Sequence, residues 1–289
     1  MKNFKEKFNK FMDILFPPDI IRIYCGEEIK HANKYHACDN CLQNLPYLNG
    51  KICKHCGTKL HSDSEICFLC YNQLPPFQIA RSTFIYEMPI VSLVHKIKYG
   101  NARYLFKPLA NFMTETYKQY AFDCDVIVPV PLSKERLKTR HYNQAEELAK
   151  VLGANLGLPI ESNCIEKIKH TEKQSSLGYF DRIANIKNAY RLKDKKPLAG
   201  KRILLVDDVI TTGETIKNVC KELWRAKPVS ISVLSLAHTD FAKKPKATFI
   251  YKIKKLTLAK IQREIAFSKN KAKIRMKIKE FKDEEKKDK

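Results

Sequence analysis

The most informative part of this 289-residue chain is Ile203-Leu-Leu-Val-Asp-Asp-Val-Ile-Thr-Thr-Gly-Glu-Thr215. Its first four residues are the short apolar run of a buried strand, and two carboxylates, Asp207 and Asp208, end that strand. A loop of threonine and glycine follows, and a helix begins near Gly213. A strand that passes through a short loop into a helix is the building unit of a parallel sheet.

The residues on either side of this stretch repeat the same unit. Apolar runs at 125–130 and 230–236 predict two further strands. Two helices are predicted from apolar residues at helical spacing: Ala145, Leu148, Ala149 and Leu152 in the first, and Ile216, Val219, Cys220, Leu223 and Trp224 in the second. Strands and helices that alternate over residues 77–240 predict an α/β domain with a parallel sheet and right-handed crossovers.

The loop that follows the acidic pair is suited to an anion. Backbone N–H groups at the start of the helix and the hydroxyls of Thr211, Thr212 and Thr215 form a ready phosphate site. Ionised Asp207 and Asp208 only accept hydrogen bonds, which suits a ribose diol, or a Mg²⁺ ion that the diol bridges. We therefore expect a sugar 5-phosphate at the carboxyl edge of the sheet.

The acidic pair has two other interpretations. A Walker-B strand of an ATPase would need a partner loop of the form G-x4-G-K-[ST], and the sequence contains none. A purely structural pair of aspartates would leave the Thr-Thr-Gly-x-Thr loop unexplained. The phosphate-binding interpretation accounts for both the acidic pair and the Thr-Thr-Gly-x-Thr loop.

The chain has ten cysteines, and seven of them fall between Cys25 and Cys70. A protein of the reducing cytosol seldom forms disulfides, so metal ligation is the first interpretation of this cluster. Four form a pattern of two C-x2-C knuckles ten residues apart: Cys53, Cys56, Cys67 and Cys70. Two such knuckles complete the tetrahedral thiolate set of a structural zinc ion. Gly57, directly after the first knuckle, permits a residue of positive φ in the turn. The sequence therefore predicts a structural Zn²⁺ site.

An internal repeat predicts another, degenerate ribbon earlier in the chain. In chain order the degenerate ribbon is the first ribbon, and the four-cysteine site above belongs to the second ribbon. Cys25, Cys38 and Cys41 repeat the spacing of the later cysteines, but Arg22 stands at the position of Cys53. The first ribbon is therefore a further candidate zinc site with three thiolates, and its fourth ligand is absent, or is water, His31 or His36. A pairing of Cys38 and Cys41 with the knuckle at Cys53 and Cys56 would break the repeat, and it stays open as the competing arrangement. The other three cysteines read as small apolar residues: Cys124, Cys164 and Cys220.

The positive charge of the chain is divided between its core and its end. Lys and Arg exceed Asp and Glu by 54 to 31, a formal net charge of +23. The last 49 residues, 241–289, hold 18 basic and 6 acidic residues, or +12 of that total. This basic tail either binds nucleic acid in a salt-dependent manner or is a solvated lysine-rich extension.

The start of the chain predicts a short amphipathic helix over residues 1–20. Phe4, Phe8, Phe11 and Leu15 recur at helical spacing, and two prolines stop the helix. The stretch lacks the h-region of a signal peptide, and no apolar run is long enough to span a membrane. We expect no membrane span and a cytoplasmic location.

Several ordered motifs resemble those of one family. The stretch Val206–Thr215 resembles the phosphoribosyl pyrophosphate (PRPP) loop of type I phosphoribosyltransferases. Together with the cysteine repeat, the rest is similar to the ComF family of competence-associated, phosphoribosyltransferase-like proteins with an N-terminal double zinc ribbon. The similarity runs from Leu15 to about His238 and includes four further motifs: His95–Gly100, Val128–Leu132, Arg136–Gln144 and Thr171–Tyr190.

This resemblance implies roles for individual residues. Asp207 and Asp208 would hold the ribose of PRPP with Mg²⁺, and the loop Thr211, Thr212, Gly213 and Thr215 would cradle the 5-phosphate. The stretch after Pro131 would be the pyrophosphate loop. Arg136 and Arg140 would contact the diphosphate or DNA, and Gln174 and Arg182 would lie in the segment over the site. His141 departs from the family, which usually has glycine there.

The resemblance also implies a function and an organisation. The protein would bind PRPP and single-stranded DNA and act in DNA uptake and natural transformation, with a competence helicase or another DNA-uptake protein as partner. The alternative is an active phosphoribosyltransferase whose acceptor is unknown. The expected organisation is a helix (1–20), a double zinc ribbon (21–76), a phosphoribosyltransferase-like domain (77–240) and a basic tail (241–289).

Overall fold

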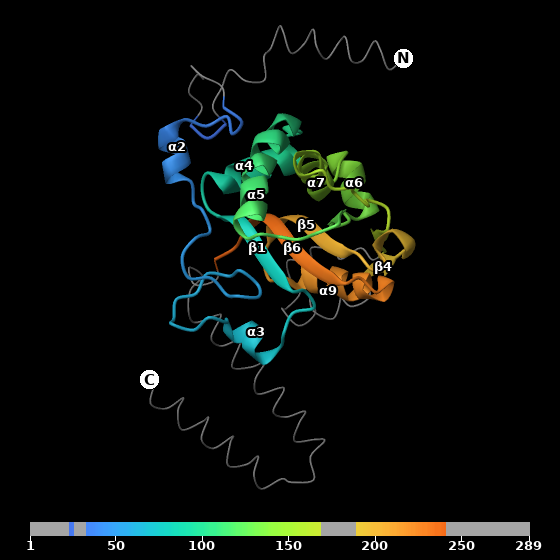
Figure 1. Ribbon diagram of the computed structural model, residues 1–289. Coiled ribbons are helices and arrows are strands. Elements are labelled where there is room, and N and C mark those ends of the chain that lie inside the picture. Colours follow the sequence, from blue (N-terminus) through green and yellow to red (C-terminus); the bar gives the residue numbers. More distant parts are fainter. Residues whose placement is uncertain (1–22, 26–32, 169–188, 241–289) are drawn as a thin grey trace, which may run out of the picture. The chain divides into compact units, whose positions relative to one another are not determined.

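The computed structural model describes residues 23–25, 33–168 and 189–240 (Figure 1). Contacts divide the chain into two units, Met1–Asp240 and Phe241–Lys289, and the second lies outside the described residues. The predicted N-terminal helix, the basic tail and four single residues also lie outside them: Arg22, His31, Gln174 and Arg182. Within the described ranges, no helix is long and apolar enough to cross a membrane.

A four-stranded parallel sheet forms the centre of the first unit, in the order β1-β6-β5-β2. The strands are β1 (Ile79–Ile85), β2 (Val126–Pro129), β5 (Arg202–Ile210) and β6 (Ser230–His238). The three strands predicted from apolar runs are confirmed, and the parallel arrangement is confirmed with them. One detail was wrong: the strand does not end at the acidic pair, because β5 stays paired with β6 as far as Ile210 and His238.

Helices cover both faces of this sheet (Figure 1). One face carries α4 (Ile90–Tyr99), α5 (Phe106–Gln119) and α7 (Gln144–Leu156), and the other carries α9 (Glu214–Leu223). The two helices predicted from apolar spacing are α7 and α9. Shorter helices complete the set: α2 (Asp39–Asn44), α3 (Phe68–Asn72), η1 (Arg103–Leu105), α6 (Lys134–Arg140), η2 (Lys196–Leu198) and η3 (Trp224–Ala226).

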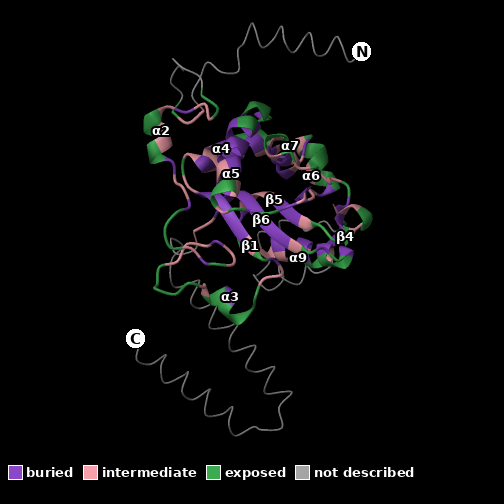
Figure 2. Ribbon diagram, in the orientation of Figure 1, coloured by how far each residue is buried: buried purple, intermediate pink, exposed green. Residues whose placement is uncertain are grey.

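Alternation along β5 explains the two-sided core. Leu204 and Val206 pack among the residues of α4, α5 and α7, whereas Ile203 and Leu205 pack against α9. Side chains of a strand alternate between the faces of its sheet, and a strand covered on both faces reads as a continuous apolar run. The buried colouring therefore fills the sheet in Figure 2.

The cysteine-rich segment covers the outer edge of β1. Before the second ribbon, Leu48 N donates to Thr83 O at 3.0 Å and Ile85 N donates to Pro46 O at 2.7 Å. In the knuckle, His55 O accepts from Ala80 N at 2.7 Å. An edge strand presents unpaired backbone groups, and here the ribbon segment satisfies several of them.

A separate two-stranded antiparallel sheet, called the β3–β4 ribbon below, flanks the carboxyl edge of the main sheet. It consists of β3 (Ile165–Lys167) and β4 (Tyr190–Leu192), with Lys167 opposite Tyr190. The Lys167 ammonium lies 5.6 Å from the centroid of the Tyr190 ring. This ribbon places both side chains beside the acidic pair of β5.

Candidate functional site

An ion pair joins the acidic pair to a lysine of another element. Asp207 and Asp208 lie in β5, and one carboxylate oxygen of each accepts the next backbone N–H at 2.8 Å. The Lys98 ammonium, near the end of α4, lies 2.7 Å from Asp208 Oδ2. Their side chains are only 21% and 13% exposed, so water screens this pair less than a surface pair. Lys98 is therefore the counter-charge of Asp208.

Burial governs the protonation of Asp207. It raises the pKa of the Asp207 carboxyl well above the usual range, and the neighbouring charge of Asp208 raises it further. The backbone N–H of Asp208 and the Lys98 ammonium act in the opposite direction. Two adjacent carboxylates resist ionising together unless positive charge compensates them. A cation bound at the pair would therefore favour the ionised form of Asp207.

Asp207 and Asp208 line a cavity with a volume of about 180 Å³, and four cations line it with them. Arg136 and Arg140 come from α6, Lys167 comes from β3, and Lys98 comes from α4. With all groups ionised, these four cations exceed the two carboxylates by two positive charges. The cavity is thus suited to a ligand that is itself strongly anionic.

Neighbouring side chains hold Arg140 in place, and burial shifts the pKa values of Lys167 and Tyr190. Arg140 donates from Nη1 to Gln144 Oε1 at 3.1 Å and from Nη2 to Tyr99 Oη at 3.3 Å. Burial lowers the pKa of Lys167, and the nearby charge of Arg136 lowers it further. Burial also raises the pKa of Tyr190 to about 12, so that its hydroxyl stays protonated at neutral pH. The site therefore offers fixed hydrogen-bond donors as well as charge.

The predicted phosphate loop forms the turn between β5 and α9. Gly213 adopts a left-handed conformation (φ +73°), and Thr212 Oγ1 accepts the N–H of Glu214 at 3.5 Å. Thr215 in the first turn of α9 lines the cavity, whereas Thr211 and Thr212 are exposed. The ten-residue helix α9 begins where the loop was predicted to present its N–H groups.

The stretch predicted as the pyrophosphate loop also borders the cavity. Val130, Pro131 and Leu132 line it, and Asn143 Nδ2 donates to Val130 O at 2.9 Å. After α6, His141 adopts φ +64°. Glycine takes this conformation without steric cost, which explains why glycine suits this position better than histidine does.

The sequence identified only part of this site. Asp207, Asp208, Thr215, Arg136 and Arg140 come together as predicted. No role was predicted for Lys98, Lys167 or Tyr190. Lys98 lies inside the motif His95–Gly100, whose similarity to the family was the one signal available for it.

The four cysteines of the second ribbon fit a zinc ion. The Sγ atoms of Cys53, Cys56, Cys67 and Cys70 all lie within 4.8 Å of one another. Cys56 Sγ and Cys67 Sγ are 3.6 Å apart, close to the roughly 3.8 Å expected between thiolates around tetrahedral zinc. The residues present therefore match a closed structural zinc site.

Close backbone packing seats this zinc site on the sheet. Gly57 has φ +68°, as predicted, and a Cβ atom there would lie 2.5 Å from Ala80 O. The buried Arg81 guanidinium donates to Cys53 O at 3.4 Å and to Lys54 O at 3.1 Å. Four thiolates around Zn²⁺ carry a net charge of −2, and Arg81 brings a compensating positive charge beneath the knuckle.

The first ribbon gathers three thiolates. The Sγ atoms of Cys25, Cys38 and Cys41 lie within 4.8 Å of one another, and His36 does not join this group among the described residues. The competing arrangement was wrong, because Cys38 and Cys41 group with Cys25 and not with Cys53. Three thiolates still leave one zinc position to be filled by another ligand.

The remaining cysteines are buried thiols in the core, as predicted: Cys124, Cys164 and Cys220. Burial raises the pKa of Cys124 and of Cys164 to about 12, and raises that of Cys220 as well. A thiol ligates metal or attacks as its thiolate, so none of the three is suited to either role.

Comparisons with known proteins agree with this architecture. The double zinc ribbon domain family matches residues 11–71, and the phosphoribosyl transferase domain family matches residues 144–268. Competence protein F of Haemophilus influenzae is 31% identical over 224 residues, which cover 74% of this chain and 95% of that protein.

Two further relatives have similar lengths of match. DNA utilization protein YhgH of Salmonella typhi is 31% identical, with 65% of this chain and 84% of that protein covered. Competence protein ComFC of Bacillus subtilis is 28% identical, with 69% and 82% covered. On its double zinc ribbon, its phosphoribosyltransferase-like parallel sheet and these relatives, the chain belongs to the ComF family.

Proposed function

We propose that this protein binds PRPP with Mg²⁺ in the cavity above β5 and acts in DNA uptake by binding single-stranded DNA in the cytoplasm. The observation that carries the PRPP proposal is the meeting of two carboxylates and four cations at the start of α9. The names of the relatives, which refer to competence and DNA utilization, support the role in DNA uptake.

Each part of PRPP has a counterpart in the cavity. Asp207 and Asp208 would accept the ribose hydroxyls or hold Mg²⁺, which commonly binds proteins through one or two carboxylates together with substrate phosphates. The helix start at Thr215 would receive the 5-phosphate. The cations of α6 and β3 would face the diphosphate, for which paired guanidinium donors are well suited.

A phosphoribosyltransferase would use the same cavity, so PRPP binding alone does not separate the two functions. Transfer needs an acceptor that adds to C1 as pyrophosphate leaves, and electrostatic stabilisation of the departing diphosphate would be the main contribution of the cations. Pyrophosphate release in the presence of candidate acceptors is the measurement that distinguishes turnover from binding.

PRPP should bind the zinc-loaded protein only when Mg²⁺ is present. Mg²⁺ would be shared by the carboxylates of Asp207 and Asp208 and the diphosphate oxygens, so that without the metal only the cations of the cavity attract the ligand. Calorimetric titration with and without Mg²⁺ tests this, while a coupled assay records pyrophosphate. Equal affinity in EDTA would contradict the proposed role of the metal, and steady pyrophosphate release would favour the enzyme.

Single-stranded DNA should bind with an affinity that falls as salt rises. Each phosphate neutralised by a lysine or arginine releases condensed counterions, so log K should fall by roughly 0.7 per contact for each log unit of salt. Anisotropy of a labelled oligonucleotide between about 50 and 300 mM KCl, roughly a sixfold range of ionic strength, measures the slope. An affinity that does not change with the salt concentration, or no binding at the lowest salt concentration, would contradict the proposed binding of single-stranded DNA.

A further inference from the structure

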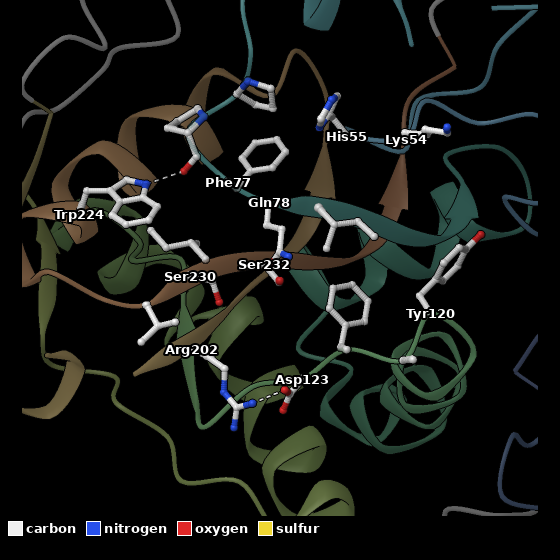
Figure 3. A pocket seen from close by; sticks show the side chains of 17 residues that line it. Lys54, His55, Phe77, Gln78, Tyr120, Asp123, Arg202, Trp224, Ser230 and Ser232 are labelled. Atoms are coloured by element: carbon white, nitrogen blue, oxygen red, sulfur yellow. Dashed lines mark hydrogen bonds and ion pairs between the residues drawn. The ribbon is translucent and has the colours of Figure 1, made fainter. Parts of the chain in front are cut away.

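A second cavity lies at the amino edge of the sheet, opposite the acidic pair (Figure 3). Its volume is about 1080 Å³, slightly above the roughly 300–1,000 Å³ of most small-molecule sites. Arg202, Ser230 and Ile79, which begin three parallel strands, all line it. Asp207 follows Arg202 by five positions of β5, or about 17 Å at the rise of a strand. The two cavities are therefore distinct.

Aromatic rings form much of the wall of this amino-edge cavity. Phe77 and Trp224 lie on one side and Tyr120 on another, with Phe122 also in the lining (Figure 3). Trp224 is 41% exposed, yet its indole N–H donates to Pro76 O at 2.8 Å. That hydrogen bond fixes the orientation of a large ring that still contacts solvent. A fixed, exposed indole is a surface on which another planar ring can stack.

Polar groups without protein partners lie between these rings. Gln78 and Ser232 appear together in the middle of Figure 3. Neither the Gln78 amide nor the Ser232 hydroxyl makes a hydrogen bond within the part of the chain that the structure describes. The amide and the hydroxyl both donate and accept, so together they match the edge of a ring that carries donors and acceptors.

The charged groups of the cavity are already paired. The Lys54 ammonium lies 2.5 Å from Glu65 Oε2, and the Arg202 guanidinium contacts both Asp123 and Asp125. Each cation of the lining thus has a carboxylate of its own. The cavity offers little net charge to a phosphate, and its recognition chemistry is that of stacking and hydrogen bonding to a neutral ring.

We propose that the amino-edge cavity binds a nucleobase, either in a free nucleotide or as one unstacked base of single-stranded DNA. A purine or pyrimidine has a flat face that can stack on the Trp224 indole. It also has a polar edge that can form hydrogen bonds with Gln78 and Ser232. The site stands on its own geometry and does not depend on PRPP binding, and only the DNA source of the base rests on the proposed function.

Trp224 is the one tryptophan of the chain, so its fluorescence reports directly on this cavity. Thymidine, its 5′-monophosphate and short thymidine oligonucleotides should each be titrated while the indole is excited at the red edge of its absorption. A base that stacks on the indole should quench the emission. Quenching at similar concentrations by all three identifies a free nucleotide as ligand, whereas quenching by the oligonucleotide at far lower concentration identifies the strand. No quenching by any of them overturns the proposal.

Matched variants separate this site from the PRPP site. Gln78→Leu removes an exposed amide and should weaken the quenching titration about tenfold, as expected for a lost hydrogen bond to the ring edge. Gln119→Leu, an exposed glutamine outside the cavity, should leave it unchanged. Asp207→Asn with Asp208→Asn should not alter the quenching. Equal weakening by Gln119→Leu, or loss of quenching in the acidic-pair variant, would contradict the placement of the nucleobase in the amino-edge cavity. This conclusion does not depend on whether the variant still binds PRPP.

Discussion

Replacing Asp207 and Asp208 together by asparagine should abolish PRPP·Mg²⁺ binding, with a loss in affinity of at least about a hundredfold. The exchange keeps the size of both side chains but removes the charges that would hold Mg²⁺ and half of the acceptor oxygens offered to the ribose. A hydrogen bond to a charged group contributes roughly 1.5–3 kcal/mol, so the loss of two such groups accounts for that factor.

The measurement is calorimetric titration of both proteins at the same pH and Mg²⁺ concentration. Asp194→Asn is the matched control, because Asp194 is exposed and, among the residues that the structure describes, its side chain accepts only the N–H of Lys196, at 2.9 Å. Thermal unfolding checks that the double variant is folded. Asparagine at position 207 should not destabilise the protein, since the Asp207 carboxyl that it replaces already resists ionisation there. Unchanged PRPP affinity in a folded double variant would refute the assignment of the site.

The parts of this site that lie in one stretch of sequence were predictable. The strand, the acidic pair and the helix after Gly213 are continuous between Ile203 and Leu223, and local apolar patterns specify each of them. The end of the strand was placed too early, because Val209 and Ile210 continue β5 only through pairing with β6. Pairing between distant segments is a tertiary effect that local patterns do not contain.

The parts that come from separate elements were not predictable in the same way. Lys98 reaches Asp208 from a helix 110 positions earlier in the chain, and Lys167 arrives on a ribbon of three-residue strands. A lysine on a helix is by default a solvated side chain, and nothing in its immediate neighbours distinguishes Lys98 from Lys96. Only the crossover topology, which brings α4 to the carboxyl edge of β5, selects one of them.

For the cysteines, the sequence predicted the site itself but not the surface on which it packs. The spacing of Cys53, Cys56, Cys67 and Cys70 was enough to predict their grouping, because a tetrahedral metal site imposes its geometry on the chain. It did not predict what the ribbon rests on. The contacts of Arg81 and Ala80 with the knuckle are visible only in the structure, and they make the zinc site part of the edge of the sheet.

Removing zinc from the second ribbon should therefore uncover the edge of β1. Structural zinc contributes on the order of 10 kcal/mol or more to the folding of a small ribbon, and four thiolates without it repel one another when ionised. The knuckle would open, and Ala80 N would lose His55 O as acceptor. The amide exchange rate of Ala80 should rise at least about a hundredfold, which corresponds to roughly 3 kcal/mol of lost local stability.

Hydrogen exchange of the Cys53→Ser protein, with zinc content measured in parallel, tests this expectation. Tyr86 is the internal reference, because its N–H donates to His238 O on the side of β1 that faces β6. Cys25→Ser is the matched control: Cys25 is exposed and belongs to the three-thiolate group, so its loss should leave Ala80 protected. Protection of Ala80 that survives the loss of zinc would mean that Arg81 and the close approach of Gly57 hold the ribbon on the sheet without the metal. Faster exchange at Ala80 with Tyr86 unchanged would instead show that the metal stabilises this edge of the sheet specifically.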